Sequence, residues 1–313
     1  MTPTRGPTVV TRHCPAKLNL SLAVLARRTD GFHDIESLMV PVDLADTLTL
    51  TSGGAPGIRL AVCFAGELAG PRGRVLARDV PADSTNLVVR AAAALAAAAG
   101  VEPALDIELC KRIPSGAGLG GGSSDAAAVL MAAAEAWELD WGPSRLAEVG
   151  STIGSDLPWF FAGGPAIAGG RGEQIMPVDP LGPLFAVIAC PATGLSTAAV
   201  YRACTPDATR AGDAGQLATA LAAGDLQGAL PFVHNALEAP ARSLCPEVDL
   251  LLADLGRAGG LCPRLTGSGS ACFTLCRTHK EAQGIAARVA AIEDAGRPRI
   301  PAVFVVTVGG PCG

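Results

Sequence analysis

The stretch Ile113–Asp125, which reads IPSGAGLGGGSSD, decides the fold of this chain. Five of the seven residues from Gly116 to Gly122 are glycines, and without Cβ atoms their backbone can approach a ligand closely. Glycine also permits the positive φ angles that turn successive N–H groups toward one anion. A helix is predicted from about Ser124 to Glu138, and its N-terminus adds unpaired N–H groups and a positive dipole end. The stretch therefore predicts a phosphate-binding turn.

Other interpretations of the turn fit less well. Gly116, Gly118 and Gly121 formally match G-x-G-x-x-G, but a dinucleotide-binding fold needs a strand after the helix, and residues 140–150 do not form a strand pattern. A Walker A loop needs a lysine after its glycines, and none follows here. A flexible turn without function is the remaining alternative, and the direct continuation into a helix argues against it.

Composition narrows the class of protein. The chain has 313 residues, 49% hydrophobic and 17% charged, which is enough for one large or two ordinary domains. A net charge of −5 without a dense basic run argues against nucleic acid as a partner. No signal peptide is recognisable and the apolar run 87–99 is too short to span a membrane, so we expect a cytoplasmic protein that binds no membrane. The ten cysteines form no C-x-x-C motif and are expected to be reduced thiols.

Apolar periodicity predicts an α+β protein. Strands are predicted over residues 8–10, 18–25, 35–51, 104–110, 184–190, 271–276 and 302–308. Helices are predicted over residues 87–99, 124–138, 143–149, 197–203, 214–222, 226–236, 246–257 and 279–292. Prolines and a glycine between Pro177 and Pro183 mark the sharpest boundary, which divides the chain into domains 1–180 and 181–313.

Five further motifs accompany the turn along the chain. They are Pro15-Ala-Lys-Leu-Asn19, Asp30-Gly-Phe-His-Asp34, Gly154-Ser-Asp-Leu-Pro158, the glycine-rich segment 163–173 and Thr266-Gly-Ser-Gly-Ser270. In this order, and together with the turn, they resemble the motifs of the GHMP kinases, which include galactokinase, homoserine kinase and mevalonate kinase. The resemblance covers nearly the whole chain. It implies an N-terminal ATP-binding domain and a C-terminal ferredoxin-like α/β sandwich, with the active site in the cleft between them, and it leaves open whether the last strand packs back on the first domain.

The resemblance also implies the residues that carry phosphoryl transfer from ATP. Asp156 would accept or orient the proton of the attacking alcohol, and Lys17 would keep that carboxylate ionised. In isolation, Asp156 would be a turn residue and Lys17 a surface lysine, and only the order of the motifs favours catalysis. Magnesium would bridge the ATP phosphates through Ser124 or Ser123. The residues expected to bind ATP are Asn86, Lys111, Pro114, Gly116, Ala117, Gly118, Leu119, Gly120, Gly121, Gly122, Ser123 and Ser124.

The triple glycine followed by two serines is closest to a branch of the family whose alcohol is carried on cytidine diphosphate. That resemblance implies a cytosine ring held between Phe32 and Tyr201, with His33 reading the edge of the base. The family has tyrosine where this chain has Phe32, so ring stacking is kept and a hydroxyl hydrogen bond is lost. The full set of expected substrate-binding residues is Asn19, Phe32, His33, Thr197, Tyr201, Gly267 and Ser268.

Two alternatives stay open at this stage. One is a GHMP kinase for homoserine or a mevalonate derivative, which would have no use for a base sandwich. The other is a nucleotide sensor without catalysis, against which the presence of both Lys17 and Asp156 argues. The sequence does not separate a monomer from a homodimer.

Overall fold

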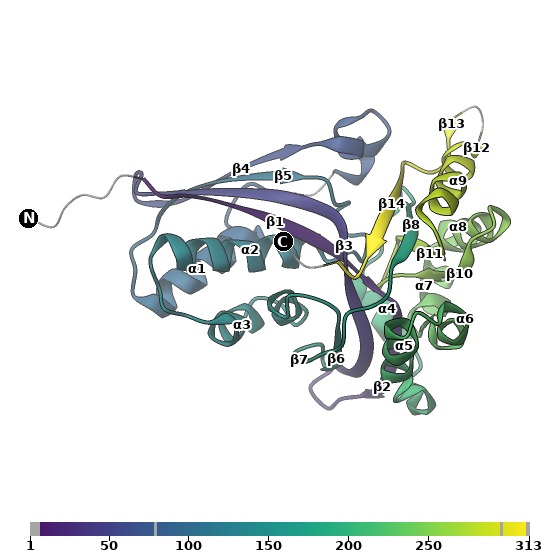
Figure 1. Cartoon of the computed structure of the whole chain (residues 1–313). Coiled ribbons are helices and arrows are strands. Elements are labelled where there is room, and N and C mark those ends of the chain that lie inside the picture. Colours follow the sequence, from purple (N-terminus) through teal and green to yellow (C-terminus); the bar gives the residue numbers. More distant parts are fainter. Residues whose placement is uncertain (1–6, 78–79, 295–296, 311–313) are drawn as a thin grey trace, which may run out of the picture.

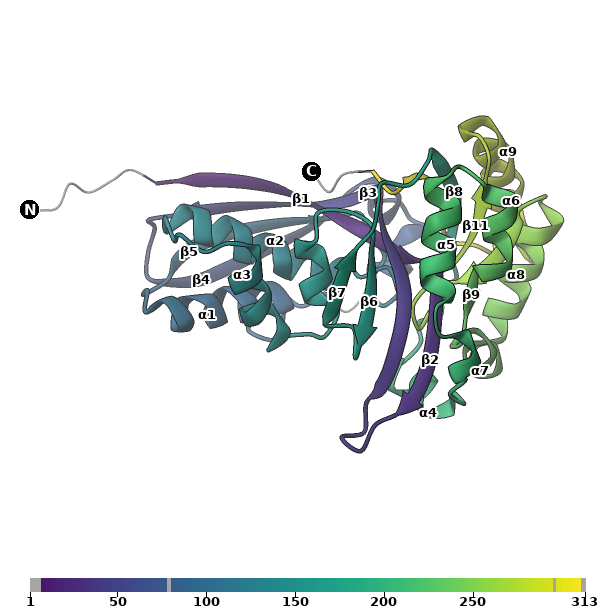
Figure 2. The same ribbon diagram turned by 60° about the horizontal axis from the view of Figure 1, so that its bottom comes forward.

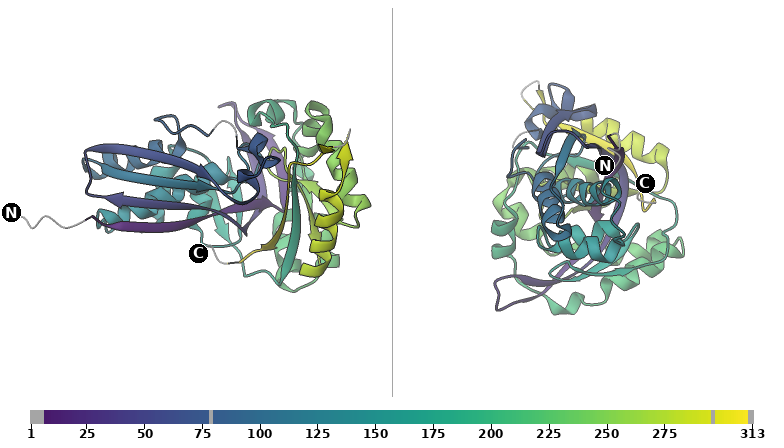
Figure 3. Two further views of the ribbon diagram at one scale, coloured as in Figure 1. Left: turned by 90° about the horizontal axis from the view of Figure 1, so that it is seen from above. Right: turned by 90° about the vertical axis from the view of Figure 1, so that its left-hand side faces the viewer.

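The computed structural model describes residues 7–77, 80–294 and 297–310. Two halves of the molecule lie side by side and share one twelve-stranded sheet (Figures 1 and 3). The longest strand, β3 (His33–Ser52), runs from one half into the other (Figure 1). Nearly every second residue along it is apolar and buried, and this alternation is what a strand with one face on a core requires. This strand pairs with neighbours in both halves, so it fixes how they are oriented.

The N-terminal half is a curved sheet with two helices against one face and a third helix packed on those two. Its strands are β1 (Val9–Asn19), β3, β4 (Gly57–Phe64) and β5 (Ala104–Lys111), and its helices are α1 (Leu87–Ala99), α2 (Gly121–Ala136) and α3 (Pro143–Ser151). Antiparallel β1–β3 and β3–β5 pairing aligns Leu48 and Leu50 with Leu109 and Ile107 on the face toward the helices. The alanines of α2 let this helix lie close to the sheet, and its buried residues include Gly121 and the whole run from Ser124 to Leu130.

The C-terminal half is the ferredoxin-like sandwich that was predicted. Its strands β8 (Leu184–Cys190), β10 (Leu261–Leu265), β11 (Cys272–Cys276) and β14 (Ala302–Val308) lie in the order β14-β8-β11-β10. The helices α8 (Pro246–Arg257) and α9 (His279–Ala290) pack against the sheet, which completes the β-α-β-β-α-β arrangement. Their apolar faces bury residues such as Leu251, Leu255 and Ile285.

The remaining elements connect or border the two halves. They are β2 (Ser21–Arg27), β6 (Ala166–Gly170), β7 (Gln174–Pro177), β9 (His234–Asn235), α4 (Thr197–Ala203), α5 (Asp213–Ala222), α6 (Leu226–Ala229), α7 (Glu238–Leu244), β12 (Glu293–Asp294), β13 (Arg297–Pro298), and the short 3-10 helices Gly66–Ala69, Gly73–Leu76, Leu157–Phe161, Ala208–Arg210 and Leu230–Phe232. The hairpin of β2 and β3 projects from the body of the molecule beside α4 (Figure 2). None of the helices in the described residues combines the length and hydrophobicity needed to cross a membrane.

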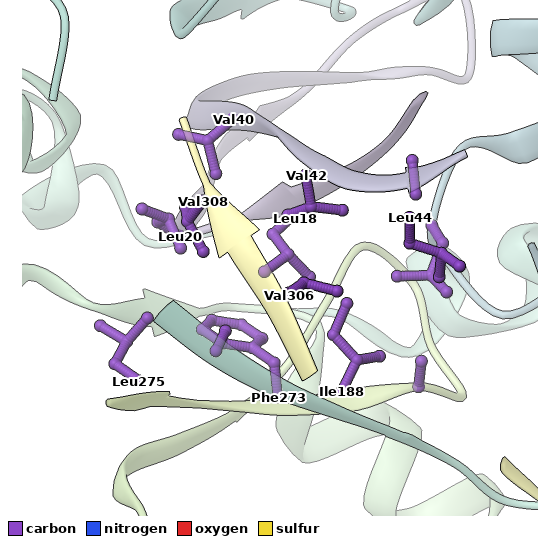
Figure 4. Close-up of a cluster of buried hydrophobic side chains, with 14 of the residues drawn as sticks. Leu18, Leu20, Val40, Val42, Leu44, Ile188, Phe273, Leu275, Val306 and Val308 are labelled. Carbon is purple, nitrogen blue, oxygen red and sulfur yellow. The ribbon is translucent and has the colours of Figure 1, made fainter. Parts of the chain in front are cut away.

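The last strand joins the halves. β14 pairs with β8 along its length and with β3 where Val308 lies opposite Val42. Figure 4 shows the core around this strand, in which Leu18 and Val42 from the first half meet Ile188, Phe273 and other side chains from the second. The halves therefore share a buried core, and the division at residue 180 stays a prediction about domains.

The α+β fold class is confirmed, and several element bounds match the prediction, among them 87–99, 184–190, 197–203, 246–257 and 302–308. The helix predicted over 226–236 is wrong, because α6 ends at Ala229 and a 3-10 turn containing Pro231 leads into β9. The phosphate-loop helix begins at Gly121, three residues before the predicted start. The strand predicted over 18–25 is divided in the structure, where β1 ends at Asn19 and β2 begins at Ser21. The elements that were not predicted are strands β4, β6, β7, β9, β10, β12 and β13 and helix α7.

Candidate active site

A cavity of about 1020 Å³ lies at the junction of the two halves. It is bordered by the turn before α2, the loop after β10, the β2–β3 hairpin and the start of α4. Every residue that the sequence predicted for the site lines this cavity, with the exception of Ser124. Segments more than 200 residues apart in the sequence, Lys17 and Gly267 among them, therefore meet at one site.

The turn before α2 is held in shape by close backbone contacts. Gly118 has a φ of +80°, and a Cβ atom there would lie 2.3 Å from the carbonyl oxygen of Thr266. Gly120 has a φ of +71° and caps α2 at its N-terminus, where a Cβ would lie 3.0 Å from the side chains of Lys17 and Phe160. Only glycine satisfies both the conformation and the contact at these two positions. The first turn of α2 thus opens toward the cavity with N–H groups that suit an anion.

A buried ion cluster fixes both ends of this turn. The Asp46 carboxylate accepts hydrogen bonds from the backbone N–H groups of Arg112 and Ile113, where the turn begins. The Lys111 ammonium is bound by Asp46 and, at 2.5 Å, by Asp125, which lies in the first turn of α2 where the turn ends. All three side chains are at most 5% exposed. The predicted ATP ligand Lys111 lines the cavity, but its charge is engaged by these two carboxylates.

Burial and charge act in opposite directions within the cluster. Burial, the largest effect, lowers the pKa of Lys111, but the adjacent Asp125 and Asp46 outweigh it and raise that pKa overall. Burial raises the pKa of Asp125 to about 7, although Lys111 opposes the rise. The charge of Lys111 therefore favours the ionised form of the buried Asp125 carboxylate.

The predicted catalytic aspartate lies directly beside the turn. Asp156 is the residue before the 3-10 helix Leu157–Phe161, and its Oδ1 accepts a hydrogen bond of 2.8 Å from the Ser123 hydroxyl at the start of α2. The carboxylate is half-buried and faces the cavity. An anion held by the turn would thus lie next to a carboxylate that can accept a proton.

Lys17 stands between the turn and the loop after β10. Its Nζ donates to Gly118 O at 2.7 Å and to Asn19 Oδ1 at 2.5 Å, which leaves one of its three N–H groups for a ligand. Burial lowers the pKa of Lys17 to about 8, while the negative charge of Asp156 acts the other way. The side chain can therefore supply a positive charge near the carboxylate at neutral pH.

The two other predicted polar residues near the turn have clear structural roles. Asn19 donates from Nδ2 to Ser37 Oγ at 2.8 Å, and its backbone N–H donates to Thr266 Oγ1 at 3.0 Å, which ties β1 to the second glycine loop. Asn86 caps α1, since its Oδ1 accepts from Val88 N at 2.9 Å. Both side chains are almost fully buried, so each presents only a small polar surface to the cavity.

The far end of the cavity is aromatic. The rings of His33 and Tyr201 lie 5.4 Å apart, while Phe32 at the tip of the β2–β3 hairpin is 50% exposed. Burial raises the pKa of Tyr201 to about 12, so its phenol stays neutral. Thr197 at the start of α4 shares a 2.8 Å hydrogen bond with Ser268 across the cavity. The three predicted aromatic residues are therefore brought together at this end.

The cavity offers oxygen ligands that suit magnesium. Ser123, Asp125 and Asp156 line it, and Mg²⁺ in phosphate sites is typically bound by one or two carboxylates together with phosphate oxygens. Ser124, the residue predicted as the metal ligand, is not part of the cavity lining, and its buried hydroxyl has no hydrogen-bond partner among the described residues. No group of three or more His, Cys, Asp or Glu side chains is assembled for a metal in the described part of the chain. The residues fit a metal that arrives with a phosphate ligand.

Comparison with known proteins identifies the class. The GHMP kinase N-terminal domain matches residues 86–164 and the GHMP kinase C-terminal domain matches residues 207–293. A homoserine kinase from Cytophaga hutchinsonii has a TM-score of 0.74 at 21% identity, covering 96% of this chain and 95% of that one, which shows the shared fold. This chain is a GHMP kinase.

The branch within that class follows from closer relatives. A 4-diphosphocytidyl-2-C-methyl-D-erythritol kinase from Pelotomaculum thermopropionicum is 40% identical over 90% of this chain and 93% of its own length. A crystal structure of a 4-(cytidine 5'-diphospho)-2C-methyl-D-erythritol kinase has a TM-score of 0.74 at 34% identity, and the match covers 96% of this chain and 100% of that one. The chain belongs to the family of 4-diphosphocytidyl-2-C-methyl-D-erythritol kinases.

Three residues at the site were missed by the sequence analysis. Asp46 and Asp125 form the cluster with Lys111, and Arg171 lies over Phe32. Asp125 ends the glycine-rich stretch itself, so a charged residue in the otherwise apolar first turns of α2 was the available signal. Asp46 takes a core-facing position in the alternation of Leu44, Leu48 and Leu50, so a carboxylate in the buried phase of a strand was the available signal there.

Proposed function

We propose that this chain transfers the γ-phosphoryl group of ATP to the 2-hydroxyl group of 4-diphosphocytidyl-2-C-methyl-D-erythritol, a step in making isoprenoid precursors. The observation that carries the proposal is the hydrogen bond between Ser123 and Asp156, which places the carboxylate at the mouth of the phosphate-binding turn. The aromatic group of Phe32, His33 and Tyr201 in the same cavity supports a nucleobase on the acceptor.

The reaction needs charge neutralisation and alignment more than covalent chemistry. A bond forms between the substrate oxygen and the γ-phosphorus, and the bond from that phosphorus to the bridging oxygen of ADP breaks. Asp156 accepts or orients the hydroxyl proton, which leaves as the new phosphate ester forms. Lys17, which is held by Gly118 and Asn19, supplies positive charge next to Asp156.

Phosphate binding is assigned to the turn from Gly116 to Gly122 and to the first N–H groups of α2. Magnesium, when bound, would neutralise phosphate charge and would be held by Ser123 or, after rotation of its buried side chain, by Ser124. Asn86 and the backbone around Pro114 border the part of the cavity left for the adenosine.

The acceptor is assigned to the other end of the cavity. The cytosine would stack between Phe32 and Tyr201, with its polar edge toward His33, while Gly267, Ser268 and Thr197 would donate to its phosphates. The described cysteines are all free thiols, which fits a reducing compartment such as the cytoplasm.

The first test replaces the proposed catalytic aspartate. Asp156→Asn should lower kcat by at least about a thousandfold while ATP still binds, because the hydroxyl then has no base and Lys17 loses its counter-charge. Asp140→Asn, an exposed aspartate after α2, is the matched control and should turn over normally. Unchanged turnover by Asp156→Asn would remove this carboxylate from the mechanism.

The choice of acceptor tests the specificity separately. The wild-type chain should phosphorylate the cytidine-diphosphate substrate far faster than the same methylerythritol phosphate without the cytidylyl group, since only the former engages the aromatic end. Equal rates for the two acceptors would reject a cytidine site, and turnover of homoserine or mevalonate instead would place the chain in another branch.

A further inference from the structure

Arg171 lies over the ring of Phe32. Its guanidinium carbon is 4.8 Å from the ring centroid, and both residues line the cavity. They come from separate elements, since Phe32 is at the tip of the β2–β3 hairpin and Arg171 is in the turn between β6 and β7. The contact therefore joins the hairpin to the part of the chain beside the catalytic aspartate.

The backbone on both sides of the contact is fixed. Arg171 N donates to Glu173 Oε2 at 2.7 Å, and the next residue, Gly172, has a φ of +118° and packs against the backbone of Ser155. On the hairpin, Phe32 N donates to Asp30 Oδ1 at 3.0 Å. The two side chains thus meet because their turns are held in place.

Phe32 needs such a contact. The ring is 50% exposed at the end of a projecting hairpin, and a phenyl ring has no hydroxyl with which to anchor itself. A guanidinium over one face attracts the ring quadrupole and restricts its rotation, and it leaves the other face free for a ligand. The neighbouring rings of His33 and Tyr201, 5.4 Å apart, line the same cavity.

We infer that Arg171 is a positioning residue for acceptor specificity, which holds the Phe32 ring in the orientation that stacks on the nucleobase of the substrate. The inference rests on the proposed function, because it needs a base-bearing acceptor. It assigns Arg171 a role through Phe32, and not a direct contact with the phosphates of the acceptor.

The first test is the Arg171→Gln variant assayed with both substrates. The KM for the cytidine-diphosphate acceptor should rise about two- to fivefold, the range expected for an exposed cation–π contact. The KM for ATP and kcat should stay unchanged, whereas general damage to the site would lower kcat as well. Arg145→Gln is the matched control, since Arg145 on α3 lies 5.1 Å from the centroid of the Trp141 ring and neither residue lines the cavity.

A double-mutant cycle separates the two ways in which Arg171 can act. If it acts through the ring, Arg171→Gln should raise the KM of the acceptor no further in a Phe32→Leu background. An equal rise in both backgrounds would overturn the inference in favour of a direct phosphate contact, and an unchanged KM in the single variant would overturn it outright. Failure of the wild-type chain to use the cytidine substrate would instead contradict the proposed function, so the two failures are distinguishable.

Discussion

The Ser123 hydroxyl donates a 2.8 Å hydrogen bond to Oδ1 of Asp156 and so links the first turn of α2 to the carboxylate after α3. Ser123 follows the glycine-rich turn to which we assign phosphate binding, and Asp156 is the carboxylate that we propose for catalysis. The bond leaves Oδ2 of Asp156 available for a second proton donor such as a substrate hydroxyl. One direct contact therefore joins the start of α2 to this carboxylate.

Replacing Ser123 tests whether this contact orients the carboxylate. Ser123→Ala should lower kcat about tenfold or more, because hydrogen bonds to charged groups contribute about 1.5–3 kcal/mol. Steady-state kinetics with both substrates would measure it. Ser151→Ala on α3, where the hydroxyl donates to a helix carbonyl, is the control and should leave kcat unchanged. A normal kcat in Ser123→Ala would show that Asp156 is oriented without this bond.

The pKa of Lys17 predicts an alkaline limit to activity. Burial lowers this pKa to about 8, so the free enzyme should lose the ammonium, and with it kcat/KM, as the pH rises through about 8. Bound phosphates favour the ammonium, so the same limit in kcat should lie at higher pH. Rate profiles between pH 6 and 10 would measure both limits.

A variant separates Lys17 from other groups that titrate in this range. Lys17→Arg keeps its charge at every accessible pH, so whatever activity remains should show no loss near pH 8. If wild-type kcat/KM stays level up to pH 9.5, a charged Lys17 is not required in the free enzyme.

The sequence predicted strands in which apolar and polar residues alternate and helices that begin and end with capping residues. α1 matched because Asn86 caps its start and Gly100, with a φ of 66°, ends it. The start of α2 was placed three residues late because Gly121 and Gly122 are poor helix formers, yet Gly121 packs where a Cβ would lie 2.9 Å from Ile113. Tertiary contact overrides propensity at that position.

Some residues of the candidate site could be predicted from the sequence and others could not. Motif order brought Lys17, Asp156 and the aromatic residues to one cavity correctly, since each motif is contiguous in the sequence. The partners of Lys111 could not be predicted, because pairing of β3 with β5 and packing of α2 bring Asp46 and Asp125 to it from 65 and 14 residues away. The position of each aspartate among buried residues could have been noticed in the sequence, but no local pattern reveals that Lys111 is the partner of both.

The stability of the fold should depend on Lys111, which is paired with two buried carboxylates. Lys111→Met should destabilise the fold by about 3–5 kcal/mol, because it leaves two buried carboxylates without their counter-charge. Urea denaturation would measure the loss, and Lys280→Met at the exposed start of α9 should change stability little.

The pH dependence of this loss distinguishes a charge effect from poor packing. The pKa of Asp125 is raised by burial to about 7 in the folded chain, so the folded state binds this proton more tightly and stability falls as the pH rises from about 4 through 7. Without Lys111 the pKa should rise further, so the difference between Lys111→Met and the wild type should be larger at pH 8 than at pH 5. A loss of equal size at both pH values would mean that Lys111 stabilises the fold by filling space and not by its charge.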